Sequence, residues 1–111
     1  MTIKDIAKAF LNKVVDGEID SAYMNYVNMK GKHHNPFFPN DFESLKQGMK
    51  DNHVEMPNKS IQFLNCITED DKVMVQSRLN LNEKDSMNTV HIFRFENNKI
   101  VELWDVAQSL P

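Results

Sequence analysis

The chain has 111 residues, a length that lets one hydrophobic core form but leaves no room for two. Hydrophobic residues make up 41% and charged residues 26%, which is the composition of a globular protein and not of a disordered or membrane-spanning one. The formal net charge is −3 and no basic stripe occurs, so a nucleic-acid partner is not expected.

The single cysteine and the N-terminal residues bear on where the protein works. Cys66 has no second cysteine with which to form an internal disulfide, which fits a reducing compartment. It falls in an apolar, strand-like run, so we expect a small core residue and not a nucleophile. The N-terminus has no charged-then-apolar signal pattern. We therefore expect a cytoplasmic protein that folds as one domain over residues 1–111.

The first quarter of the chain carries helical periodicity. Thr2 is placed to cap a helix, and apolar side chains recur at three- and four-residue spacing from Ile3 to Val14. Gly17 is expected to end this helix. A second, shorter helix is predicted over about residues 19–27.

Residues 33–39, HHNPFFP, fit neither the helical nor the strand repeat, and the two prolines disfavour a regular element there. Asn40 followed by Glu43 resembles a capping box and predicts the start of a third helix. His53 is expected to be a helix-end or surface residue, and Pro57 stops the helix.

After the third helix the period of the apolar residues changes from about four to two, which is typical of strands. Asn97-Asn98 predicts a hairpin turn, because asparagine tolerates the left-handed backbone that such turns require. The strands are expected over about residues 59–68, 73–81, 87–96 and 99–107. Helices followed by a meander of long strands predict an α+β fold.

The last predicted strand contains a carboxylate in an apolar setting. Alternation places Asp105 on the same face as Val101, Leu103 and Ala107. A carboxylate there is costly unless it is paired or its pKa rises, and a raised pKa suits a general base that removes a proton from carbon. The alternative is structural: Asp105 accepts hydrogen bonds from the backbone or from Arg78.

Two histidine positions could assist that carboxylate. In residues 33–36, HHNP, a histidine could transfer a proton near neutral pH and Asn35 could donate to an oxyanion. The alternative is a satisfied structural histidine and an asparagine that caps the loop. The chain has four histidines, but no His-x-x-x-His pair and no second cysteine, so a metal site is not expected.

His91 shares a strand face with Phe93 and Phe95. Either this face lines a cavity or His91 is an ordinary half-buried strand residue. If His91 and Asp105 face one cavity from adjacent strands, each could set the protonation state of the other.

Three segments occur in the order and spacing of a known family: His34-Asn35-Pro36, residues 90–96 (VHIFRFE) and residues 99–108 (KIVELWDVAQ). Together they resemble the SnoaL-like family of the nuclear transport factor 2-like superfamily, over nearly the whole chain. The resemblance implies a cone-shaped α+β barrel, in which three N-terminal helices pack on a curved, mainly antiparallel sheet.

In SnoaL-like polyketide cyclases an aspartate near this end is the acid/base of an intramolecular aldol condensation, and Asp105 is the matching position. Other proteins on this fold isomerise ketosteroids, hydrate, dehydrate, or only bind ligands. The chain differs from many relatives at His91, where they carry an acidic residue, and at Leu103, where they carry histidine.

The resulting hypothesis is an enzyme without a cofactor, a lyase or isomerase that acts on a small apolar carbonyl compound. Asp105 would take the proton α to the carbonyl, with His34 and His91 as its catalytic partners. The residues that we expect to contact the substrate are Asn35, Phe37, Arg78, Phe93, Trp104 and Gln108.

The alternative is a non-catalytic module on the same fold that binds a small ligand or serves dimerisation, with Asp105 merely hydrogen-bonded. Under either hypothesis we expect a homodimer, because the outer face of the sheet leaves Trp104 and Val106 to bury.

Overall fold

The helices and strands follow the expected order with one addition. The computed structural model describes residues 1–111, and its elements are α1 (Ile3–Val15), α2 (Ile19–Tyr26), β1 (Val27–His33), α3 (Phe42–Glu55), β2 (Ser60–Glu69), β3 (Lys72–Asn80), β4 (Ser86–Glu96) and β5 (Lys99–Ser109). The predicted helices and long strands are confirmed, with ends that shift by one or two residues. The short strand β1 was not predicted.

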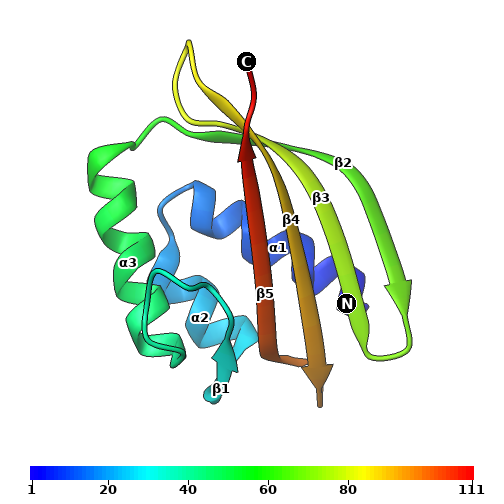
Figure 1. Cartoon of the computed structure of the whole chain (residues 1–111). Coiled ribbons are helices and arrows are strands. Elements are labelled where there is room, and N and C mark those ends of the chain that lie inside the picture. Colours follow the sequence, from blue (N-terminus) through cyan, green and yellow to red (C-terminus); the bar gives the residue numbers. More distant parts are fainter.

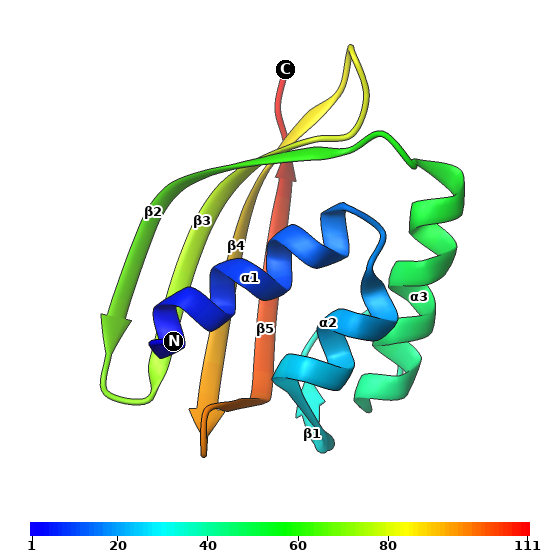
Figure 2. The same ribbon diagram turned by 180° about the vertical axis from the view of Figure 1, so that it is seen from behind.

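The strands form one curved sheet with the order β1-β5-β4-β3-β2. Neighbouring strands from β2 to β5 are antiparallel, whereas β1 runs parallel to β5. Figure 1 shows this sheet with the helices behind it, and in the reverse view of Figure 2 helix α1 crosses the concave face while α3 flanks its side. The α+β prediction is confirmed, although the sheet is open because β1 and β2 do not pair.

Local sequence signals set the helix ends. The Thr2 hydroxyl accepts from the backbone N–H of Asp5 at 3.2 Å, and the Asp5 carboxylate accepts from the N–H of Thr2 at 3.1 Å, which completes a capping box. The third helix is capped by Asp41, one residue after the predicted Asn40, and its carboxylate accepts from the N–H of Ser44 at 2.8 Å.

The strand β1 was missed because its sequence, VNMKGKH, has no alternation; only Val27 and His33 at its ends are buried. Its pairing depends on β5, which is distant in the sequence. Gly31 permits this pairing, since a Cβ atom there would lie 2.2 Å from the carbonyl oxygen of Val101. The missing side chain of Gly31 therefore lets the two strands approach each other.

The core fills the space between the helices and the concave face of the sheet. Phe10, Tyr23, Phe42 and Phe93 are almost fully buried, and Phe10 packs edge-on against both Tyr23 and Phe93. Cys66 packs at the margin of this core, as predicted.

A bulge in β5 determines which side chains face the helices. Phe95 pairs with Ile100, but Arg94 pairs with Glu102, so Val101 has no partner of its own. Ile100 and Leu103 both enter the core as a result, while Val101 lines a hollow on the opposite, outer face. The predicted position of Val101, on the same face as Leu103 and Asp105, was thus wrong, because simple alternation does not foresee the extra residue.

Gly17 joins α1 to α2 and should not tolerate a side chain. Its φ is +87°, and a Cβ atom would lie 2.3 Å from Nε2 of His53 in α3. We expect Gly17→Ala to lower the free energy of unfolding by about 1–3 kcal/mol, measured by urea denaturation. In a His53→Ala background the loss should shrink but persist, because only the contact is relieved. An unchanged urea midpoint for Gly17→Ala would contradict this account.

Candidate functional site

A cavity of about 750 Å³ opens between the helices and the concave face of the sheet. Its walls come from the second half of α1, from α3, from the segment 34–38 and from the inner faces of the strands. More than half of the lining residues are hydrophobic, as is usual for small-molecule sites. The polar lining residues are His34, Asn35, Asn52, Lys59, Thr89, His91 and Asp105.

Asp105 is held in this cavity by Asn35. The amide Nδ2 of Asn35 donates to Oδ2 of Asp105 at 3.1 Å. The Oδ1 atom of the same amide accepts from the backbone N–H of Phe37 at 2.9 Å, so the Asn35 side chain is fixed at both ends. This arrangement engages one carboxylate oxygen of Asp105 and fixes the orientation of the group.

His91 lies directly opposite Asp105 on the neighbouring strand, and both side chains line the cavity. Burial lowers the pKa of His91, and the negative charge of Asp105 offsets part of that shift. The imidazole is therefore neutral near pH 7. Its Nδ1 atom is buried without a hydrogen-bond partner, which leaves a polar group of the cavity wall unsatisfied.

The loop that carries Asn35 is anchored by His33, which is buried. The Nε2–H of His33 donates to the carbonyl oxygen of Pro39 at 2.6 Å, and its Nδ1 accepts from the backbone N–H of Asn35 at 3.0 Å. Together the two contacts require the neutral Nε2–H tautomer, because Nδ1 must accept while Nε2 donates. His33 is thus the satisfied structural histidine that was one of the two alternatives for this segment.

His34 borders the cavity, but its ring is committed elsewhere. Its Nε2 lies 2.7 Å from Oε2 of Glu102, and its ring stacks on Trp104 with 4.9 Å between the centroids. Arg94 donates to the other oxygen of Glu102 at 2.9 Å, and Lys32 lies 3.9 Å from the carboxylate. The hydrogen bonds from His34 and Arg94 lower the pKa of Glu102. These contacts tie the loop to β5, and the expected catalytic role of His34, which lines the cavity, stays a prediction.

The structure brings only part of the predicted substrate contacts together. Asn35 and Phe37 line the cavity, whereas Phe93 is a fully buried core residue. Trp104 is occupied by its stacking on His34, and Gln108 is exposed and outside the cavity.

Arg78 is not the partner of Asp105. The alternation that buries Ser77 turns Arg78 to the opposite face, where its guanidinium donates to the hydroxyl of Ser86 at 3.0 Å. Arg78 does not line the cavity and makes no contact with Asp105, so the structure does not place it at the expected substrate site.

Sequence reasoning missed Lys59, which lines the cavity and donates to Oδ1 of Asn52 on α3. A signal was present, because Ile61 and Phe63 are packed against the core and alternation places Lys59 on their face.

Tyr23, on α2, is a further residue that the sequence analysis did not single out. Its phenol is buried, and burial together with the negative charge of Asp105 raises its pKa strongly. The hydroxyl therefore keeps its proton, which it donates to the sulfur of Met49 at 3.1 Å. No local pattern in the sequence places this hydroxyl near Asp105.

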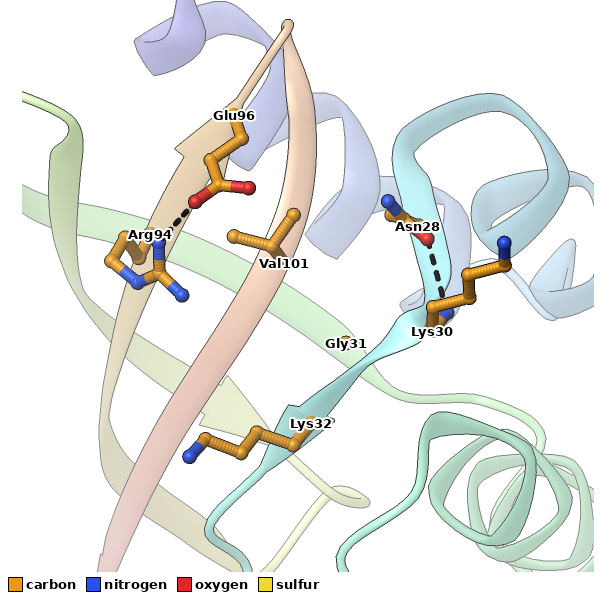
Figure 3. A pocket seen from close by; sticks show the side chains of 7 residues that line it. All are labelled: Asn28, Lys30, Gly31, Lys32, Arg94, Glu96 and Val101. Carbon is orange, nitrogen blue, oxygen red and sulfur yellow. Dashed lines mark hydrogen bonds and ion pairs between the residues drawn. The ribbon is translucent and has the colours of Figure 1, made fainter.

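A second hollow, of about 350 Å³, lies on the outer face (Figure 3). Lys30, Lys32 and Arg94 surround it, and Figure 3 shows Arg94 reaching Glu96, at a distance of 2.9 Å. Arg94 also donates to Glu102, so the glutamates offset much of the positive charge of this hollow.

Comparison with solved structures identifies the fold. A cystatin-fold protein from Novosphingobium aromaticivorans matches with a TM-score of 0.80 and 14% identity, over 96% of this chain and 98% of its own. An NTF2-like protein of unknown function from Cytophaga hutchinsonii matches with a TM-score of 0.77 and 16% identity, over 97% of this chain and 91% of its own. A SnoaL-like polyketide cyclase from Agrobacterium tumefaciens matches with a TM-score of 0.79 and 14% identity, over 97% of this chain and 92% of its own.

The chain therefore has the fold of the NTF2-like superfamily, which confirms the resemblance to SnoaL-like proteins at the level of structure. At these identities the comparison establishes the fold alone. No protein-family model and no curated protein matches the sequence.

No group of three or more His, Cys, Asp or Glu side chains is arranged to hold a metal ion. None of the helices has the length and apolar character needed to cross a membrane.

The lowered pKa of His91 makes stability depend on pH. The folded protein binds this proton less readily than the unfolded chain, so the stabilisation from His91 is complete above its ordinary pKa of 6.5 and is lost as the pH falls below it. We expect the free energy of unfolding to fall between about pH 6.5 and pH 5, and less steeply in His91→Gln. Urea denaturation across this range measures both slopes.

Glu102 does not contribute to the slope between about pH 6.5 and pH 5. Its pKa is lowered in the folded protein, so the stabilisation that its carboxylate provides is lost only below its ordinary pKa of 4.5. Equal slopes for the wild type and His91→Gln would show that His91 is not a buried neutral histidine.

Proposed function

We propose that this chain is a cofactor-independent, cytoplasmic enzyme in which Asp105 acts as acid/base on a small carbonyl compound. The reaction class is an aldol-type condensation, an isomerisation or a dehydration, each of which begins with loss of a proton α to the carbonyl. The observation that carries the proposal is the juxtaposition of Asp105 and His91 on the wall of a mostly apolar cavity.

The chemistry divides between these side chains. The Asp105 oxygen that Asn35 does not engage takes the α-proton, and the electron pair moves onto the carbonyl oxygen. A neutral imidazole can donate a hydrogen bond to the carbonyl oxygen, and His91 has this role when the ligand is bound. Asp105 then returns the proton to another atom of the product. The apolar walls limit the water that would compete for these contacts.

Similarity to a SnoaL-like polyketide cyclase from Agrobacterium tumefaciens supports this reaction class, because that protein shares the fold over 97% of this chain. The cavity of about 750 Å³ lies within the usual range for small-molecule sites.

One observation favours the alternative, a module that binds a small ligand without reaction. The carboxylate of Asp105 accepts a hydrogen bond from Asn35. A purely structural role requires a carboxylate that is paired in this way. The two functions differ in whether a bound carbonyl compound loses its α-proton.

Exchange of the α-proton for deuterium tests the proposal directly. Small apolar ketones and aldehydes are incubated with the protein in D2O, and the α-proton signals are followed by NMR. We expect Asp105→Asn to slow this exchange by about 10²–10⁴-fold, because a positioned general base supplies an effect of this size. The thermal unfolding midpoint should change little.

Asp70→Asn is the matched control, because Asp70 is exposed in a turn with φ +54°, a backbone that asparagine tolerates. It should exchange protons at the wild-type rate. Full exchange in Asp105→Asn would rule out Asp105 as the base. Ligands that bind to the wild type without any exchange would establish the binding module instead.

We further propose a homodimer formed through the outer face of the sheet. Ile92 lies opposite Trp104, and the next pair along this face is Val90 with Val106, whose side chain is 65% exposed. These apolar side chains are neighbours across β4 and β5, and Val90, Ile92 and Trp104 are half-buried.

Sedimentation velocity measures the oligomeric state. We expect a dimer for the wild type and for Val54→Glu, a control on the exposed side of α3, and a monomer for Ile92→Glu. A wild type that stays monomeric at high concentration would refute this interface.

A further inference from the structure

Lys59 is a cation in the cavity wall with no anionic partner. Its ammonium group donates to the carboxamide oxygen of Asn52, and none of the ion pairs of the chain includes it. Ile61, Leu79 and Met87 also line the cavity, and they are neighbours in the sheet because Leu79 pairs with both of the others. A charge beside apolar walls loses solvation, and burial accordingly lowers the pKa of Lys59.

Lys59 and Asp105 lie toward opposite ends of the cavity. Ser60, the next residue after Lys59, pairs with Asn80, and Asn80 pairs with Ser86 at the start of β4. His91, opposite Asp105, stands five residues further along β4, a rise of roughly 17 Å at the usual spacing of a strand. An elongated ligand can therefore meet both groups.

We propose that Lys59 and Asn52 form the binding site for a carboxylate at one end of the ligand, whose carbonyl end lies beside Asp105 and His91. The substrate class is then an elongated, mostly apolar keto acid or similar carbonyl acid. An anionic group supplies the missing counter-charge of Lys59, and the amide of Asn52 can donate to its second oxygen.

The charge of Asp105 makes this orientation unique. In the reverse orientation the ligand carboxylate would lie beside the carboxylate of Asp105 and be repelled. At the other end of the cavity the ammonium group of Lys59 attracts it. The position of the carbonyl rests on the proposed function, but the carboxylate site does not, because it requires no reaction.

Binding of chain-matched probes tests the carboxylate site. Octanoate and octan-1-ol present the same apolar chain with and without a carboxylate, and their affinities are measured by NMR titration. We expect the wild type to prefer octanoate, and Lys59→Met to bind octanoate about tenfold more weakly while its affinity for octan-1-ol is unchanged. Lys59→Arg should keep most of the preference.

Lys4→Met, at an exposed position of α1, is the control and should bind both probes as the wild type does. Asp105→Asn should bind octanoate at least as tightly as the wild type, whatever its rate of α-proton exchange, so the two proposals fail separately. The proposal is overturned if the wild type binds octan-1-ol as tightly as octanoate, a comparison that needs no variant. It is also overturned if Lys59→Met retains wild-type affinity for octanoate.

Discussion

The extra residue at Val101 determines which polar side chains enter the cavity. The turn at Asn97-Asn98 pairs Phe95 with Ile100, and an unbroken ladder from there would place Trp104 opposite His91. The bulge shifts the register by one residue, so that Asp105 takes that place instead. The same segment of β5 receives β1 at Gly31, whose missing side chain admits the carbonyl group of Val101. Backbone geometry thus places a carboxylate beside a neutral imidazole.

The polar groups around this pair have separate tasks. His33 anchors the loop from within, and His34 ties it to Glu102 from outside. Asn35, held between them, orients Asp105. In the cavity wall, Asn35 engages only one oxygen of Asp105, and Nδ1 of His91 has no hydrogen-bond partner. At the other end of the cavity Lys59 has no anionic partner. A carboxylate, an imidazole and a cation along a mostly apolar cavity are the groups on which the proposed carbonyl acid substrate rests.

Features that depend on neighbours in the sequence could be predicted. The capping box at Thr2 and the turn at Asn97-Asn98, where both residues have positive φ, follow from residue types at fixed spacing. Alternation placed Asp105 among apolar neighbours and left a cavity-lining position of His91 as one of two alternatives, and it did not foresee the bulge that pairs the two residues. The strand β1, the contact of His34 with Glu102 and the phenol of Tyr23 near Asp105 depend on segments far apart in the chain. One sequence carries no local signal for such contacts.

The interaction between Asp105 and His91 is the central claim, and a titration of the His91 ring nitrogens by ¹⁵N NMR tests it most directly. Burial should give His91 a pKa below its ordinary 6.5, and Asp105→Asn should lower that pKa further, because the carboxylate of Asp105 partly offsets the effect of burial. Both results together would place the two groups side by side in a water-poor cavity. A His91 that titrates at its ordinary pKa, or that does not respond to Asp105→Asn, would contradict this account.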